Sequence, residues 1–248
     1  MEDTDIYNPV YFIKDALRKE MRARSREWFS RSGAEEKTAA ELERLKARLL
    51  ALPELANAEN IMVYLNLPRE FPTIPLLRNI LFPPPSEEGM EGRENGKRRR
   101  IIVPRCEGRD LRLFLLADSE DFPAMSPPGE RDIGRLQTEW LDEILNERLE
   151  VGAFGILEPK PGPSEMEKFG FQPEDIDLVL VPALAFDPAC RRLGKGKGYY
   201  DRFFQLVRPN VPLIGICFDW QVVPVVPTES HDRKVTCVLS PGGEHRPE

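Results

Sequence analysis

A glycine-rich segment that carries two lysines restricts the possible folds of this chain more than any other stretch. The segment, RLGKGKGYYD at Arg192–Asp201, follows an apolar run at 178–186 and leads into an apolar pattern of Tyr200, Phe203, Phe204 and Val207. Offsets of 0, 3, 4 and 7 place these side chains on one face of a helix. The segment therefore predicts a buried strand, a loop and then a helix over 199–207.

The same segment has the composition of a phosphate-binding loop. Alternating glycines let the backbone adopt positive φ and approach a ligand closely. N–H groups at a helix start, with the ammonium groups of Lys195 and Lys197 beside them, suit a phosphate. The loop matches neither Walker A nor the dinucleotide motif G-x-G-x-x-G, because Gly194, Gly196 and Gly198 are two residues apart. A tight turn whose lysines only face water is the alternative.

Two carboxylates and a basic stripe each allow two interpretations. Asp201, in the first turn of the predicted helix, is either a Mg²⁺ ligand beside phosphates or a partner of the helix dipole. Asp232, taken alone, is typical of a turn residue. Lys14, Arg18 and Arg22 recur every four residues, which by itself is typical of a solvated helix face. No G-x-S-x-G motif occurs, which argues against a serine hydrolase.

The order of the remaining patterns predicts the fold class. Helices are expected over 10–29, 34–51 and 73–81, and strands over 60–65, 101–103, 111–116, 155–159, 177–181, 211–218 and 235–239. Several strands are apolar throughout, so we expect a single-domain α/β fold with three layers, α/β/α, around a mainly parallel, Rossmann-like sheet. Ligands bind beyond the carboxyl ends of such strands. The loops expected at that edge follow Leu65, Val103, Leu157, Val181 and Phe218.

The boundaries follow from composition along the chain. We expect the domain to cover 10–240, with tails at 1–9 and 241–248. Residues 83–100 are rich in Pro, Gly and charge and predict a flexible surface insertion. Its KRRR end is typical of a solvated loop end, with a nuclear-localisation patch as the alternative. Residues 118–134 are expected to be irregular.

Charge and cysteine usage limit the partners. The 248 residues carry a net charge of −7, which argues against a general nucleic-acid binder. The four cysteines form no C-x-x-C pair and only two histidines occur, so a structural zinc site is not expected. The chain start resembles no secretory or transit signal, and no apolar stretch is long enough to span a bilayer. We expect a cytoplasmic monomer that binds a small molecule, with a mitochondrial pool left open.

At this point the motifs resemble a known family. The runs Val181–Asp187 and Arg192–Asp201 resemble the signature of 5-formyltetrahydrofolate cyclo-ligases, also called 5,10-methenyltetrahydrofolate synthetases. KDALR at Lys14–Arg18 and the stretches 65–70, 156–159 and 231–232 follow in that family's order. The likeness covers about 10–240 apart from the insertion. Lys195 departs from the family's usual Arg, and Thr236 departs from its frequent Asp.

The resemblance implies a reaction, ligands and residue roles. The reaction converts 5-formyltetrahydrofolate, possibly polyglutamylated, to 5,10-methenyltetrahydrofolate with ATP and Mg²⁺, by phosphorylation of the formyl oxygen and ring closure by N10, and releases ADP and phosphate. Catalysis is implied for Lys195, Lys197 and Tyr199. ATP contacts are implied for Lys14, Arg18, Arg192, Leu193, Gly194, Lys195, Gly196, Lys197, Gly198, Tyr199 and Tyr200. Folate contacts are implied for Leu65, Glu70, Phe154, Lys195, Gly196, Lys197, Gly198 and Tyr199, and Mg²⁺ ligation for Asp201 and Asp232.

Two other classes of function stay open on the sequence. One is a different enzyme on a similar frame, such as a sugar-phosphate isomerase or a CoA transferase, which would be active without ATP. The other is a protein that binds nucleotide or folate without catalysis, which would release no ADP.

Overall fold

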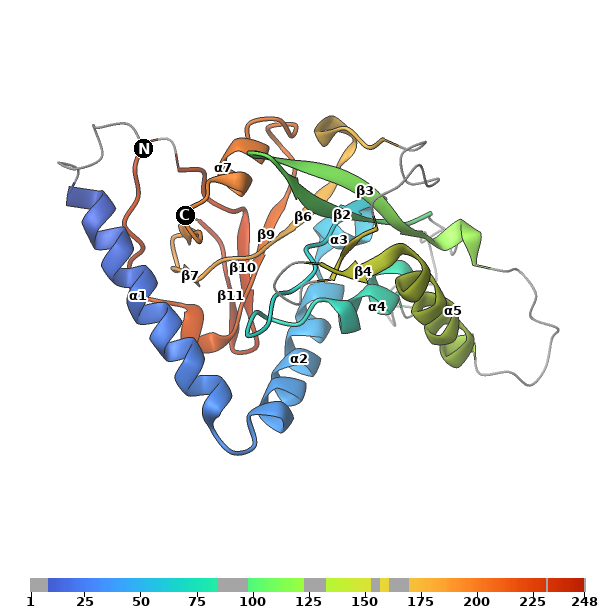
Figure 1. The fold of residues 1–248 in the computed structure, drawn as a ribbon, viewed down its shortest axis with the longest axis horizontal. Coiled ribbons are helices and arrows are strands. Elements are labelled where there is room, and N and C mark those ends of the chain that lie inside the picture. Colours follow the sequence, from blue (N-terminus) through green and yellow to red (C-terminus); the bar gives the residue numbers. More distant parts are fainter. Residues whose placement is uncertain are drawn as a thin grey trace.

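The computed structural model describes residues 9–83, 98–122, 133–152, 157–160, 170–230 and 232–247. Within them a sheet runs in the order β11-β10-β9-β6-β1-β2-β3 (Figure 1). Its strands are β1 (Asn60–Met62), β2 (Arg100–Glu107), β3 (Asp110–Asp118), β6 (Leu178–Val181), β9 (Leu213–Ile216), β10 (Cys237–Ser240) and β11 (Gly243–His245). The strands from β10 to β2 are parallel, and only the outer strands β3 and β11 pair antiparallel. The prediction of a mainly parallel sheet is confirmed.

Helical segments lie on both faces of this sheet. They are α1 (Pro9–Ser30), α2 (Ala34–Leu50), α3 (Pro53–Asn57), α4 (Leu77–Leu81), α5 (Ile133–Arg148) and α7 (Tyr199–Phe203), with 3-10 turns η2 (Ile74–Leu76), η3 (Ser119–Asp121), η5 (Pro173–Asp175) and η6 (Asp219–Gln221). Because side chains alternate along a strand, Ile61 packs with α2 to α5, whereas Met62 packs with Phe203 of α7 on the other face. The three-layer α/β/α prediction is confirmed.

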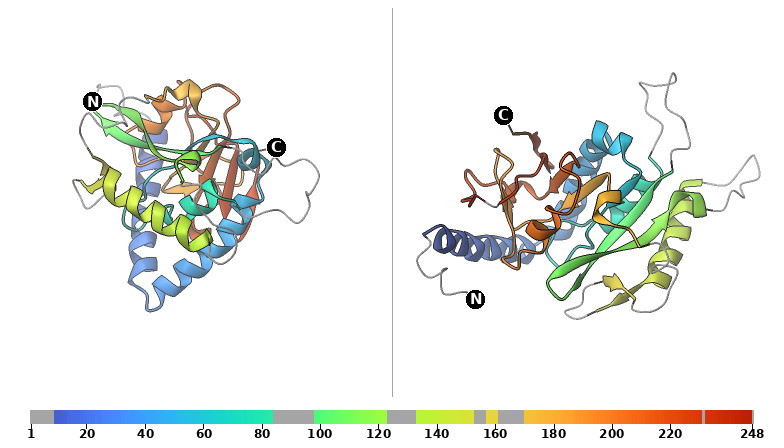
Figure 2. Two further views of the ribbon diagram at one scale, coloured as in Figure 1. Left: turned by 90° about the vertical axis from the view of Figure 1, so that its right-hand side faces the viewer. Right: turned by 90° about the horizontal axis from the view of Figure 1, so that it is seen from above.

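The first helix is anchored at one end of the molecule, beside the glycine-rich segment. Figure 2 shows α1 and α5 at opposite ends of the sheet. Met21 of α1 is buried against Leu193, Val223 and Val226, which belong to a small core of their own. Helix α1 is therefore fixed next to the residues that precede the glycine-rich loop.

Several element boundaries differ from the predictions. Residues 133–148 form α5 although no helix was expected there. β5 (Leu157–Pro159) pairs with β4 (Leu149–Val151) in a separate ribbon, so Leu157 does not belong to a strand of the main sheet. β2 continues to Glu107, and thus Val103 is inside a strand. β1 ends at Met62 and α7 at Phe203, earlier than the apolar patterns suggested.

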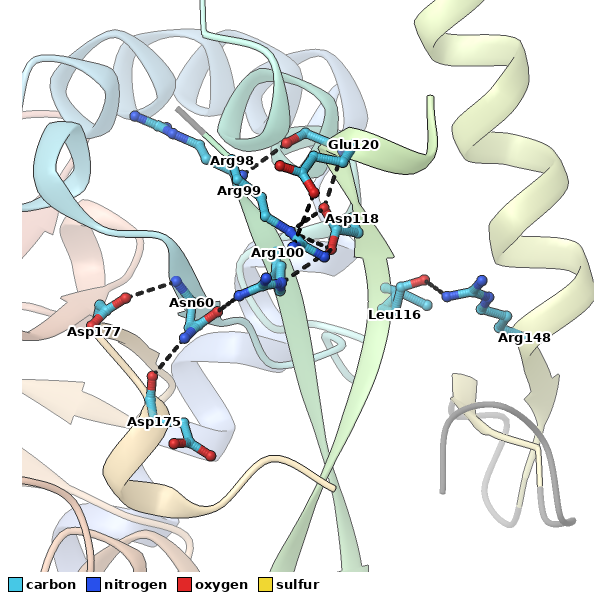
Figure 3. A network of polar contacts seen from close by, with 11 residues as sticks. Asn60, Arg98, Arg99, Arg100, Leu116, Asp118, Glu120, Arg148, Asp175 and Asp177 are labelled. Carbon is cyan, nitrogen blue, oxygen red and sulfur yellow. Dashed lines mark hydrogen bonds and ion pairs between the residues drawn. The ribbon is translucent and has the colours of Figure 1, made fainter. Parts of the chain in front are cut away.

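The basic end of the predicted insertion is built into the fold. Residues 84–97 lie outside the described ranges, but Arg98, Arg99 and Arg100 lie within them. Arg98 and Arg100 pair with the buried Asp118 (Figure 3). The buried Arg99 donates to the carbonyl of Ile80 at 2.8 Å. The prediction of a solvated loop end is wrong for these three arginines, because a buried carboxylate and a helix-end carbonyl take their donors.

Over the part of the chain that the structure describes, no helix combines the length and the apolar character needed to cross a bilayer.

Candidate functional site

A cavity of about 450 Å³ lies where the carboxyl ends of β1 and β6 meet the glycine-rich loop. Its volume is within the range of small-molecule sites. The walls come from several elements, and the lining residues are Arg22, Tyr64, Leu65, Leu67, Glu70, Pro104, Arg105, Cys106, Leu111, Leu157, Glu158, Pro182, Ala183, Arg192, Gly194, Lys195, Gly196, Lys197, Gly198, Tyr199, Tyr200 and Asp201. The site thus lies at the sheet edge where α/β folds bind their ligands.

The glycine-rich loop has the backbone geometry that its sequence predicts. Its base is held by β8 (Arg192–Leu193), which pairs with β7 (Ala185–Phe186). Gly196 has φ +99° and Gly198 has φ +69°, in the left-handed region that favours glycine. Gly198 is also the N-cap of α7, so the turn into the helix depends on it.

Two arginines from outside the loop hold its backbone. Arg18 of α1 donates from Nε to the carbonyl of Gly194 at 3.1 Å. Arg202 of α7 donates to the carbonyl of Lys197 at 3.2 Å, and its guanidinium lies 5.4 Å from the centre of the Tyr199 ring. Because both arginines bind backbone carbonyls, they position the loop without using its lysines.

Inside the cavity, two ion pairs join four of the predicted site residues. Lys195 Nζ lies 2.5 Å from Glu70 Oε1, and Glu70 Oε2 accepts from the Leu67 N–H at 2.8 Å. Arg192 pairs with Asp201 and stacks its guanidinium 5.6 Å from the Tyr200 ring centre. Lys197 makes no ion pair with any residue that the structure describes.

The charge of the cavity favours an anionic ligand. Five lining side chains are basic and three are acidic, so the cavity has a net charge of plus two, whereas the whole chain has a net charge of −7. The basic residues are Arg22, Arg105, Arg192, Lys195 and Lys197, and the acidic residues are Glu70, Glu158 and Asp201. A concave surface of one sign concentrates ligands of the opposite sign. This property separates the cavity from the acidic remainder of the chain.

Two neutral groups in the cavity keep their protons. Burial, with a smaller contribution from Glu70, raises the pKa of Tyr200 well above its ordinary value, so its hydroxyl stays a hydrogen-bond donor. That hydroxyl is buried and has no hydrogen-bond partner among the described residues. Burial and the nearby Glu158 carboxylate raise the pKa of the Cys106 thiol. Tyr200 therefore carries a buried hydroxyl donor that no described residue satisfies.

Lys14 and Asp232 meet each other outside the cavity. The buried Lys14 Nζ lies 2.6 Å from Asp232 Oδ2 and 2.7 Å from Glu229 Oε2. Asp232 lines a separate shallow hollow beside Arg233 and Phe204. The two carboxylates predicted to hold Mg²⁺ thus line different hollows, and no group of three or more His, Cys, Asp or Glu side chains among the described residues is arranged to hold a metal ion.

Most, but not all, of the predicted site residues lie in the cavity. Eleven of them line the cavity, namely Leu65, Glu70, Arg192, Gly194, Lys195, Gly196, Lys197, Gly198, Tyr199, Tyr200 and Asp201. Leu193 is buried in the small core beside α1, and Phe154 lies outside the described residues. Arg22, Tyr64, Arg105, Cys106 and Glu158 are lining residues that were not predicted. Arg22 follows Lys14 and Arg18 at the same spacing of four residues, and this spacing could have identified it as a site residue.

Comparison with known proteins decides the family. The 5-formyltetrahydrofolate cyclo-ligase family matches residues 96–241, more than half of the chain. This chain belongs to the 5-formyltetrahydrofolate cyclo-ligase family. The sequence resemblance and the assignment to a ligase family are therefore confirmed, and the glycine-rich loop of this family member falls inside the matched residues.

Relatives extend the match over most of this cyclo-ligase family member. A probable 5-formyltetrahydrofolate cyclo-ligase of Schizosaccharomyces pombe is 24% identical over 206 residues, which cover 78% of this chain and 80% of the relative. The 5-formyltetrahydrofolate cyclo-ligase of Saccharomyces cerevisiae is 26% identical, covering 83% and 86%. The NMR structure of Aquifex aeolicus 5,10-methenyltetrahydrofolate synthetase has a TM-score of 0.63 at 26% identity and covers 94% of this chain and 92% of that one.

Proposed function

We propose that this protein converts 5-formyltetrahydrofolate to 5,10-methenyltetrahydrofolate with ATP and Mg²⁺ and releases ADP and phosphate. The observation that carries the proposal is a positively charged cavity whose wall is the glycine-rich loop of the family signature. Family membership supports the folate substrate, and the charge of the cavity supports a phosphate-bearing co-substrate. We further infer one ligase domain over 10–240, acting as a monomer in the cytoplasm.

The proposed reaction explains why a phosphate-binding loop and a folate site adjoin. The formyl oxygen attacks the γ-phosphorus of ATP, and ADP leaves. N10 then attacks the activated carbon to close the ring, and the former formyl oxygen departs as part of inorganic phosphate. Phosphoryl transfer depends mainly on positioning and charge neutralisation. A loop that presents backbone N–H groups and lysines supplies both.

The contacts divide the proposed roles between the two lysines. Lys195 pairs with Glu70 on the wall assigned to folate, so we assign it to orienting the formyl end of the substrate. Lys197, which has no ion pair with a described residue, is assigned to the transferred phosphate. The buried Tyr200 hydroxyl is assigned to a phosphate oxygen, because it is an unsatisfied donor beside Arg192. Tyr199 borders the same space.

The donor set in the cavity suits Mg²⁺ bound together with phosphates. Mg²⁺ usually takes one or two carboxylates, several waters and phosphate oxygens, and Asp201 supplies a carboxylate next to the loop. When bound, the ion would neutralise charge on the phosphates. Asp201 is paired with Arg192, so it would exchange this cation for Mg²⁺ when the ion is bound. Asp232 pairs with Lys14 and lines a different hollow, so it is not placed beside Asp201.

An assay for the methenyl product tests the proposal. The protein is mixed with 5-formyltetrahydrofolate, Mg²⁺ and ATP, and the near-UV absorbance of the product is followed with and without ATP. We expect product only with ATP, together with ADP. Folded protein that forms no product overturns the proposal. Binding of both ligands without ADP release would indicate a non-catalytic binding protein instead.

Variants of the loop test the assignment of the site. Lys197→Ala and Asp201→Ala are each expected to lower turnover at least about 100-fold, the scale of losing one preorganised electrostatic contact. Lys19→Ala on the exposed face of α1 is the matched control and should keep wild-type turnover. If both loop variants retain wild-type turnover, the site lies elsewhere.

A further inference from the structure

Arg22 is a basic side chain on the cavity wall that neither the loop motif nor the proposed chemistry accounts for. It comes from α1, is solvent-exposed, and lines the same cavity as Leu65, Leu67 and Glu70. Among the described residues it makes no hydrogen bond or ion pair, unlike its neighbours Lys14 and Arg18 on the same stripe. Its guanidinium is thus available to a ligand in this cavity.

The course of α1 places Arg22 between the two halves of the proposed site. One turn earlier, Arg18 holds Gly194, and a Cβ on Gly196 would lie 3.5 Å from its guanidinium carbon. Further along the helix, Trp28 packs on Phe218, whose ring centre lies 4.8 Å from that of Phe71, the residue after Glu70. α1 therefore passes from the phosphate loop toward the segment assigned to folate, with Arg22 on the way.

The other cations of the cavity already have tasks within it. Arg192 pairs with Asp201, and Lys195 pairs with Glu70. Arg105 donates to the carbonyl of Pro159 at 3.0 Å, which ties β2 to β5. Lys197 belongs to the phosphate loop itself. Arg22 is the exposed lining cation to which the proposed chemistry gives no role.

We infer that Arg22 binds a carboxylate of the glutamyl tail of the folate substrate; this inference rests on the proposed function. With the formyl group at the loop, the glutamyl tail is the part of the folate left to contact the exposed α1 wall of the cavity, where Arg22 lies. Its carboxylates are the permanently charged groups of that substrate. The planar guanidinium fork matches a carboxylate in a bidentate arrangement, and such charge-assisted pairs are stronger than neutral hydrogen bonds. Arg22 is thereby a specificity-determining residue.

Kinetics on two substrates test the inference. Arg22→Ala should raise KM for 5-formyltetrahydrofolate at least about tenfold and leave kcat and KM for ATP within about twofold. Arg22→Lys keeps the charge but loses the guanidinium fork, so its KM for 5-formyltetrahydrofolate should lie between those of wild type and Arg22→Ala. On 5-formyltetrahydropteroate, which lacks the glutamate, wild type and Arg22→Ala should have equal KM values. Calorimetric titration of the folate measures the same contact without turnover.

The controls separate this inference from the proposed function. Arg26→Ala, one turn further along α1 and outside the cavity lining, should behave as wild type. Because Arg22 is exposed, its loss should leave the melting temperature unchanged. Wild-type turnover together with an unchanged KM in Arg22→Ala overturns the inference alone. A rise in KM for ATP in Arg22→Ala also overturns the inference, because it would indicate a phosphate contact. An equal rise in KM for 5-formyltetrahydropteroate, which lacks the glutamate, overturns it as well.

Discussion

At the scale of single residues, Cys106 offers a chemical probe of the cavity. Its side chain is exposed and lines the cavity, whereas Cys190, Cys217 and Cys237 are buried. We expect a maleimide to modify Cys106 alone and to block turnover, with ATP and folate slowing the reaction. Because its pKa is raised, the thiolate fraction and the labelling rate should grow about tenfold per pH unit from neutral pH upward. Mass spectrometry and residual turnover measure both effects.

The control for this labelling is Cys106→Ser. That variant should take up no maleimide under the same conditions. A stoichiometric adduct on Cys106 with full residual turnover would show that the cavity is not the route of the substrate.

Residues that share one motif were predictable from the sequence, and residues that come together from distant elements were not. The loop residues line the cavity together because they are contiguous. Lys14 and Asp232 were predicted as separate ligands, one for ATP and one for Mg²⁺, yet they bond each other across 218 positions. A sequence pattern states which chemistry a side chain carries, but only the fold determines which partner it meets.

At the scale of elements, the backbone of the loop is expected to limit function. Gly196→Ala puts a Cβ on a residue with φ +99°, where strain costs about 1–3 kcal/mol. The loop would relieve the strain by moving away from Arg18, so we expect turnover to fall at least tenfold, which corresponds to about 1.4 kcal/mol of transition-state stabilisation. Steady-state kinetics and thermal unfolding measure the two effects.

Gly243→Ala in β11 is the matched control for the loop variant. An added Cβ there meets nothing within 4 Å, and the residue lacks positive φ. Its turnover should equal that of wild type. Wild-type turnover in Gly196→Ala would mean that the loop conformation is not needed for catalysis.

Long periodic patterns in the sequence predicted most of the major helices and strands, whereas short segments carried too little pattern to predict an element. Helix α2 was predicted nearly to its ends because it has a long apolar stripe, and helix α1 because its basic residues recur every four positions. The missed helix α5 carries an apolar stripe too, in Leu141, Ile144 and Leu145, which pack on the main core. The two-residue strands β7 and β8 have no period to detect, and their pairing depends on the close approach of 185–186 and 192–193.

At the scale of the whole molecule, binding and stability are assigned to opposite edges of the sheet. The cavity lies at the carboxyl ends of the parallel strands. At their amino ends a polar network joins neighbouring strands (Figure 3). There Asp177 accepts from the Asn60 N–H at 2.9 Å, Asn60 accepts from Arg100 at 3.0 Å, and Arg100 donates to Asp118 at 3.0 Å. A change in this network is therefore expected to alter folding and leave ligand affinity intact.

Asp118 is the central residue of that network and gives its stability a pH dependence. Burial alone would raise its pKa, but hydrogen bonds from Arg98, the Glu120 N–H and Arg100 outweigh burial and lower it. The contribution is therefore complete above the unfolded-state pKa of about 3.9 and is lost as pH falls through the lower folded-state pKa. Asp118→Asn should lose about 2 kcal/mol of unfolding free energy at pH 7, because the buried carboxylate gives up charge-assisted hydrogen bonds from the partly exposed Arg98 and Arg100.

Urea unfolding of wild type and Asp118→Asn between pH 7 and pH 2 tests this assignment. The difference between them should be constant down to about pH 5 and shrink below about pH 4, where the wild-type carboxylate also takes up a proton. Glu107→Gln is the control, since its ion pair with Arg112 is exposed and should be worth less than about 1 kcal/mol. KM values for ATP and folate should be unchanged in both variants at neutral pH. A raised KM in folded Asp118→Asn would mean that the network at the amino edge also shapes the cavity, since strain would then travel through β1 and β2 to the residues at their carboxyl ends.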